Sequence, residues 1–324
     1  GHFSFFVFGP KNSPFGATRW LGWIPEIFAG YHRVRNRVSR WWQRRLGYTG
    51  YFQLYSVPFK RLPWLDYTEK HDLYEPGGII GGQEAIFAHW ERSGKSWSRS
   101  DWRKDDQTNV AQLITEIKKG EIELSYLFTS KLDATMHAHG TEGPEVDKAF
   151  ERFSDWMRQI ESAARDHYED VRIHLFSDHG MAVTQHDSRM MPEFESLGLK
   201  YGIDYAAVWD STMVRFWFPG GEKVKTTVTT WLNARKEGRI LSDEELKANG
   251  CLFPSGRYGE LWYLLPEGTI FAPSFMNQRH VTGMHGYDPR EPASPACWLT
   301  NHAAYPAPAR INEIYHVMKE AADS

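Results

Sequence analysis

The sequence predicts an α/β fold in which a mostly parallel sheet is flanked by helices on both faces and carries a smaller inserted subdomain. Short apolar runs alternate with helical patterns along the chain. In the clearest example, the apolar runs 122–128 and 171–176 lie on either side of a long amphipathic stretch. A strand, a helix and a second strand form a βαβ unit, and such units build parallel sheets covered by helices.

The helices are predicted from local signals. Residues 86–94 and 108–120 have helical patterns, and each pattern ends at a glycine, the residue most common just past the last helical turn. Between 145 and 165, apolar residues recur at spacings of three and four, which places them on one face of a helix. These apolar residues are Val146, Phe150, Phe153, Met157 and Ile160.

The chain divides into three predicted parts. Residues 1–200 form the main α/β domain, with an irregular excursion at 16–78 that is rich in Trp, Tyr, Pro and Arg. Residues 201–265 form the inserted subdomain, because "STMVRFWFPGG" indicates a strand and turn and "DEELKANG" a polar helix. Residues 266–324 return to the main domain.

Bulk properties exclude some classes of protein. The 324 residues are enough for one large or two medium domains with a substantial core. A net charge of −3 argues against a nucleic-acid partner for the protein as a whole. Only Cys251 and Cys297 are present, too few for a disulfide framework, which favours a reducing compartment. No apolar run reaches about 18 residues, so no spanning helix is predicted. The oligomeric state is not indicated.

An aspartate and a histidine directly follow the apolar run 171–176. Asp178 and His179 stand at the carboxyl end of this predicted strand, where open α/β sheets bind ligands. Neighbouring side chains on an extended strand point to opposite faces, so both reach one ion only if the chain turns. Gly180 makes such a turn easy.

Two further segments carry the same residue types. Asp133 and His137 follow the run 122–128 and are four residues apart, so one helical turn brings them to the same side. His285 lies among glycines in "VTGMHGYDP". Carboxylate and imidazole together suit zinc or another borderline divalent ion, whereas calcium recruits oxygen ligands.

Several of these residues and their neighbours also fit purely structural roles. An Asp-His pair at a strand end is often only a hydrogen-bonded turn. His139 is expected at the surface or behind the ligands. His186 and Asp187 either line a substrate groove or form a solvated turn, and Ser177 is expected to pack the strand end and not to act as a nucleophile.

A basic segment runs from 27 to 65 without an acidic residue. One interpretation is a solvated helix that packs on the domain through its Trp side, with Val34, Val38, Trp41, Trp42 and Leu46 on a shared face. The alternatives are an interfacial helix on an anionic membrane surface and a basic rim that collects a polyanionic substrate; single-stranded nucleic acid is the least favoured partner. The basic residues are Arg33, Arg35, Arg37, Arg40, Arg44, Arg45, Lys60 and Arg61.

The motifs "LDATMHAHG", "FSDHGM" and "MHGYDP", in this order, resemble the alkaline phosphatase superfamily. The branch they most resemble is the type I phosphodiesterase/nucleotide pyrophosphatase family. The resemblance covers about residues 75–305, including "SGKSWSRSDW". It implies an alkaline-phosphatase-like fold that hydrolyses phosphodiester or phosphate monoester bonds at a two-metal site, through a covalent phospho-enzyme intermediate.

The resemblance also implies roles for individual residues. Asp133, His137 and His285 match the ligands of one ion, and Asp178 and His179 match two ligands of the other. Family members usually hold zinc, with Mn²⁺ or Ca²⁺ as alternatives. The family's nucleophilic threonine or serine and its remaining aspartate ligand are expected before residue 1, because "GHFSFFVFGP" resembles the residues that follow that segment. The resemblance leaves open whether the chain as given turns over substrate.

Two alternative functions remain on the same scaffold. A sulfatase or phosphonate hydrolase would use the same ligands, so the substrate class is a phosphate- or sulfate-ester small molecule. A non-catalytic family member would instead bind metal, or bind lipid through residues 16–78.

Overall fold

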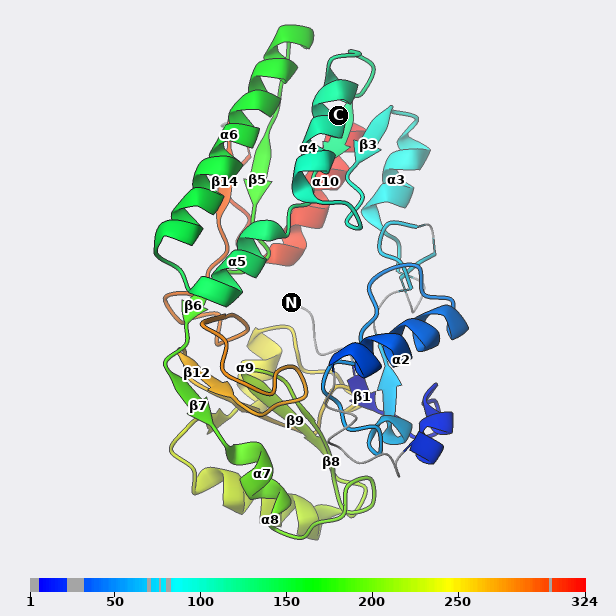
Figure 1. Ribbon diagram of the computed structural model, residues 1–324, viewed down its shortest axis with the longest axis vertical. Coiled ribbons are helices and arrows are strands. Elements are labelled where there is room, and N and C mark those ends of the chain that lie inside the picture. The colour runs from blue at the N-terminus through cyan, green and yellow to red at the C-terminus, as the bar shows by residue number, and fades with distance from the viewer. Residues whose placement is uncertain (1–5, 22–31, 69–70, 76, 80–82, 303–304) are drawn as a thin grey trace.

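Helices and strands alternate along the chain in the computed structural model (Figure 1). The structure describes residues 6–21, 32–68, 71–75, 77–79, 83–302 and 305–324. The predicted α/β class is confirmed. In the described part of the chain, no helix is long and apolar enough to cross a membrane.

One layer of the fold is built on a parallel pair of strands. β3 (Trp97–Arg99) and β4 (Leu124–Tyr126) pair in parallel, and α4 (Asp106–Ile117) connects them. Asp105 begins α4 by accepting a hydrogen bond from the Thr108 backbone, and Gly120 follows its end with a φ of 70°. The helices α3 (Ile86–Ser93) and α10 (Ile314–Asp323) cover the face opposite α4. Helices therefore lie on both faces, as predicted.

A second layer lies beside α4. The short helix α5 (Lys131–His139) leads into α6 (Pro144–His167), which packs along α4. β5 (His174–Phe176) follows and pairs with β14 (Trp298–Thr300) in the antiparallel direction. The segments 122–128 and 171–176 were expected to be buried strands. Their strands form, but the side chains of β4 and β5 are only half-buried or exposed.

The other half of the molecule contains a four-stranded antiparallel sheet, in the order β10-β11-β9-β8. A short turn joins β8 to β9, a connection that produces an antiparallel pair, whereas longer connections, each of which contains a helix, lead to β10 and β11. Three helices accompany the sheet (Figure 1). The strands and helices are β8 (Ala206–Trp209), β9 (Met213–Trp217), β10 (Arg239–Ile240), β11 (Leu261–Leu264), α7 (Met190–Glu195), α8 (Glu222–Asn233) and α9 (Asp243–Ala248).

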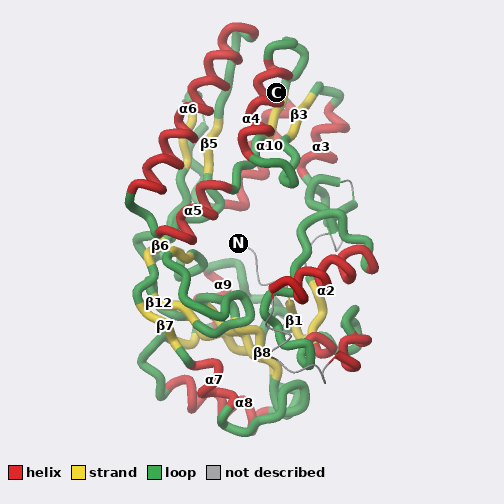
Figure 2. Tube along the Cα trace, in the orientation of Figure 1, coloured by secondary structure: helices red, strands yellow, loops and turns green. Residues whose placement is uncertain are grey.

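Short strand pairs connect the two halves. β6 (Ala182–Val183) pairs with β13 (Gly283–Met284) in the antiparallel direction, and β7 (His186–Ser188) pairs with β12 (Thr269–Phe271) in parallel. Figure 2 shows that long loops surround these strands. The β6–β13 pair is important for function because it lies between the segments that carry the predicted ligands.

The N-terminal segment packs on the four-stranded sheet. β1 (Phe6–Phe8) pairs with β2 (Leu65–Tyr67), and α2 (His32–Arg45) lies beside them with two short 3₁₀ helices, Gly16–Leu21 and Leu62–Trp64. The largest core cluster contains side chains from both 6–67 and 190–275. Part of the predicted excursion at 16–78, including 22–31, lies outside the described residues. The domain boundaries remain a prediction.

The prediction of a mostly parallel sheet is met only in part. Among the described strands, β3–β4 and β7–β12 are parallel, and the remaining pairs are antiparallel. The predicted βαβ unit corresponds to β4, α6 and β5, but among the described strands β4 and β5 belong to different pairs, and the parallel partner of β4 is β3, which the sequence pattern did not identify. The pattern also could not indicate that β5 takes the distant strand β14 as its antiparallel neighbour.

Candidate metal centre

Two segments that are far apart in the sequence bring three ligand-type side chains together. Asp133 and His137 lie one turn apart on α5, and His285 directly follows β13. The distances from Asp133 Oδ1 are 3.5 Å to His137 Nε2 and 3.9 Å to His285 Nε2. The three side chains can offer ligand atoms that all lie within 4.8 Å of one another.

Hydrogen bonding decides which nitrogen of His137 is free. Its Nδ1 lies 2.8 Å from the carbonyl oxygen of Gly283. A carbonyl only accepts, so Nδ1 carries the proton and the lone pair of Nε2 faces Asp133. Asp133 Oδ1 is itself buried and has no hydrogen-bond partner. In the neutral imidazole the Nε2 lone pair and the carboxylate oxygen face each other, an arrangement that a cation would stabilise.

The pair Asp178–His179 repeats this arrangement. His179 donates through Nδ1 to the carbonyl oxygen of Gly180 at 2.8 Å, and its Nε2 lies 3.4 Å from Asp178 Oδ1. The His179 ring stacks on the His285 ring, with centroids 3.6 Å apart and planes 16° apart. The two predicted halves of the site are therefore neighbours in space.

His285 is held in its neutral form. Burial, with smaller contributions from the nearby His179 and His137, lowers the pKa of His285 to about 3. A histidine must be neutral to bind a metal ion, so at neutral pH this imidazole is ready to act as a ligand.

Two glycines allow the backbone to approach the site closely. A Cβ on Gly180 would lie 2.1 Å from the carbonyl oxygen of Ala293, and one on Gly283 would lie 2.3 Å from that of Met136. The sequence argument for Gly180 was that glycine eases a turn. That reason was wrong, because Gly180 is not among the glycines with positive φ and is needed instead for the close contact with Ala293.

The remaining sequence candidates lie in different surroundings. His139 is exposed, as the preferred interpretation had it. His186 and Asp187 lie exposed on β7 and are not part of the Asp133 cluster. Asp187 pairs with His280 at 2.7 Å, a histidine that the sequence argument missed because no short motif connects the two.

Ser177 has a structural role. Its Oγ accepts a hydrogen bond from the Cys297 backbone at 2.9 Å, and its own backbone nitrogen donates to the Cys297 carbonyl. The interpretation of Ser177 as a residue that packs the strand end is therefore consistent with the structure.

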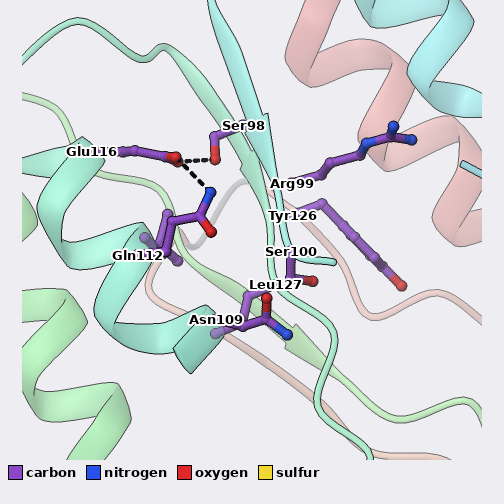
Figure 3. Close-up of a pocket in the computed structure, with 9 residues that line it drawn as sticks. Ser98, Arg99, Ser100, Asn109, Gln112, Glu116, Tyr126 and Leu127 are labelled. Carbon is purple, nitrogen blue, oxygen red and sulfur yellow. Dashed lines mark hydrogen bonds between the residues drawn. The ribbon is translucent and has the colours of Figure 1, made fainter. Parts of the chain in front are cut away.

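A small polar pocket lies near the "SGKSWSRSDW" segment. It lies between β3, β4 and α4, where Glu116 accepts hydrogen bonds from Ser98 and Gln112 (Figure 3). Its volume of about 10 Å³ accommodates roughly one water molecule. These hydrogen bonds tie α4 to β3 and leave no space for a substrate.

Comparison with known families agrees with this geometry. The sequence matches the family model described as type I phosphodiesterase/nucleotide pyrophosphatase over residues 25–288. The chain belongs to this family. It is therefore a phosphoric ester hydrolase of the alkaline phosphatase superfamily, and members of the type I phosphodiesterase family are metal-dependent. A search of curated proteins gave no match.

Solved structures show the same fold at low sequence identity. Murine ectonucleotide pyrophosphatase/phosphodiesterase 5, in an inactive form with AMP, has a TM-score of 0.60 and 16% identity over 81% of this chain and 76% of its own. The human protein has a TM-score of 0.59 and 14% identity, over 77% of this chain and 72% of its own. Phosphonoacetate hydrolase from Sinorhizobium meliloti, in complex with phosphonoacetate, has a TM-score of 0.54 and 14% identity, over 77% of this chain and 78% of its own.

Proposed function

We propose that this type I phosphodiesterase family member hydrolyses a phosphodiester at a two-ion site. Asp133, His137 and His285 hold one divalent ion, and Asp178 and His179 contribute to the second. One observation carries the proposal: the buried, unpartnered Asp133 Oδ1 faces the Nε2 atoms of two histidines. A cation between these atoms would satisfy all three.

The donor set favours zinc. Two imidazoles and one carboxylate match the nitrogen and oxygen ligands of catalytic zinc sites, which keep a further position open. Mn²⁺ accepts the same mixed donors, and Ca²⁺ fits less well because it takes six to eight oxygen ligands.

The bound ions would stabilise charge on the phosphoryl oxygens and lower the pKa of an oxygen nucleophile. The protein's own contribution is positional. The carbonyls of Gly283 and Gly180 hold His137 and His179 in the tautomer that presents Nε2. Burial keeps His285 uncharged, so it does not repel an incoming cation.

A phosphate-ester small molecule is the substrate class, and we propose a phosphodiester within it. The family match supports this, as does the AMP bound by the murine relative. A phosphonate is the second candidate, because phosphonoacetate hydrolase shares the fold. His186 and Asp187 are candidates for substrate contacts, since both side chains are exposed on β7.

Metal content tests the ligand assignment. Asp133→Asn removes the charge that the two histidines face, so we expect about one zinc-like ion fewer per chain by elemental analysis, and loss of bis(4-nitrophenyl) phosphate hydrolysis. His139→Ala is the matched control, because His139 lies on the same helix but is exposed. Equal metal content in wild type and Asp133→Asn would contradict the assignment.

A substrate panel tests the reaction class. We expect hydrolysis of bis(4-nitrophenyl) phosphate to exceed that of 4-nitrophenyl sulfate and phosphonoacetate. A preference for phosphonoacetate would favour the second candidate, and a preference for the sulfate ester would identify a sulfatase. Metal binding without any turnover would favour the non-catalytic alternative.

A further inference from the structure

The helix α2 has one inner and one outer face of different chemistry. On the inner side, Trp42 is buried and packs edge-on against Phe15 with centroids 5.5 Å apart. Ser39 Oγ accepts a hydrogen bond from the Leu54 backbone. Arg35 donates to the carbonyls of Tyr55 and Val57 at 2.6 and 2.7 Å. These contacts determine which side of the helix faces outward.

The outer face is a stripe of arginines. Arg33, Arg37, Arg40 and Arg44 recur at spacings of three and four, so they fall within an arc of about 60° on the helix. All four side chains are exposed, as is Arg45 beside them. Among the described residues, no ion pair involves any of the five, and Arg40 only bonds the Asn36 carbonyl of its own helix.

Apolar residues border the stripe. Trp41 is 55% exposed and lies edge-on against Trp42, and Val34 is exposed about two turns before it. The sequence pattern predicts Trp41 and Val34 on the same inner face as Trp42. That placement was wrong, because the inner contacts of Trp42 and Ser39 turn Trp41 and Val34 outward.

In the described part of the chain, the first two acidic residues that follow α2 in the sequence, Asp66 and Asp72, are already paired. Asp66 lies 3.6 Å from Arg257, and Asp72 accepts from Arg103 at 2.9 Å. Arg61, at the end of the basic segment, is buried and pairs with Glu195. These neighbours therefore do not neutralise the positive charge of the α2 stripe, and the buried Arg61 does not add to it.

We propose that the outer face of α2 docks on an anionic lipid bilayer surface. When a helix lies parallel to such a surface, its arginines pair with lipid phosphates and an exposed tryptophan lies at the level of the headgroups. A single exposed Trp with a Val beside it suits a flat interface better than single-stranded nucleic acid, which stacks successive bases on several aromatic rings. This inference does not depend on the metal site.

Vesicle flotation with the full chain tests the proposal. We expect the protein to bind vesicles of phosphatidylcholine that contain about 30% phosphatidylserine, and not to bind vesicles of phosphatidylcholine alone. This binding should weaken as the salt concentration rises. Combining R37Q, R40Q and R44Q should lower the partition coefficient roughly a hundredfold, because each basic residue near such a surface contributes about a factor of five. Trp41→Ala should lower it severalfold without altering its salt dependence.

The matched control removes the same charge elsewhere. R152Q, R158Q and R165Q alter three exposed arginines of α6 and should leave vesicle binding unchanged. Hydrolysis of a soluble phosphodiester by all variants should match wild type, which separates docking from catalysis and from misfolding. Equal loss in both triple variants, or binding that does not require anionic lipid, would overturn the proposal. So would binding to a single-stranded oligonucleotide, but not to vesicles, through the α2 arginines.

Discussion

At the scale of single residues, Asp288 holds the loop that carries His285. One carboxylate oxygen accepts from the backbone and Nε of Arg290 at 3.0 and 2.9 Å. The other accepts from Arg239 at 2.6 Å and again from Arg290 at 2.7 Å. These hydrogen bonds, above all those from Arg290, hold the pKa of Asp288 well below its ordinary value of 3.8. The loop is thereby tied to β10.

This depressed pKa makes a prediction about pH. Asp288→Asn should lower the free energy of unfolding by about 2 kcal/mol at neutral pH, because charge-assisted hydrogen bonds to a buried carboxylate are lost. The stabilisation is present above the ordinary pKa and is lost as pH falls below about 4, so the two proteins should converge in acid. Urea unfolding at several pH values measures this.

The control for Asp288 is an exposed ion pair. Asp170→Asn breaks a surface ion pair with Arg172, and it should lower the free energy of unfolding by less than about 1 kcal/mol at all pH values. If Asp288→Asn and wild type differed by the same amount at pH 3 and pH 7, the hydrogen bonds would not be the cause.

At the scale of elements, only part of the apolar face of α6 is buried. The spacing argument correctly predicted the helix and its boundaries to within a few residues. Of the five apolar positions, Val146 and Ile160 are buried, whereas Phe150 is 46% exposed. Ile160 packs into a cluster with Val110 and Leu113 of α4. A periodic pattern identifies the face, but the neighbouring helix decides which part of the face is covered.

Two substitutions on the same helix distinguish these positions. Ile160→Ala should lower the free energy of unfolding by about 3 kcal/mol, because it leaves a cavity between α6 and α4. Phe150→Ala removes a larger side chain that remains partly in water, and should cost less than about 1 kcal/mol. Thermal and urea unfolding measure both, and a larger loss for Phe150→Ala would mean that another surface covers it.

At the scale of the whole molecule, Arg215 joins distant segments. It is completely buried on β9 and donates to the carbonyls of Tyr258 and Phe6, each at 2.7 Å. The latter bond holds β1 against the four-stranded sheet. A buried polar network of this kind orders the segments around it when its groups are satisfied.

Loss of Arg215 should affect the whole fold. Arg215→Ala should lower the free energy of unfolding by about 3 kcal/mol or more, because it leaves a cavity and two buried carbonyls without a donor. Arg215→Met keeps most of the volume, so a similar loss would assign the effect to the hydrogen bonds. Arg257→Ala, half exposed beside Asp66, is the control and should change stability little.

The sequence by itself determined the helices α3, α4 and α6, the glycines that follow α3 and α4, the α/β class and the ordered set of ligand-type residues. These features depend on residues within about one or two helical turns of one another, so a single sequence contains them. The choice between His137 and His139 came from the family motif, and the structure places His137 beside Asp133 and leaves His139 exposed.

Only the tertiary structure decided the rest. It brought His285 next to Asp133, gave β5 an antiparallel partner, and turned Trp42 inward and Trp41 outward. It also showed that Gly180 is needed because the backbone at Ala293 leaves no space for a side chain. Each of these outcomes depends on contacts between segments far apart in the sequence, where excluded volume and burial select one arrangement among several that local patterns allow.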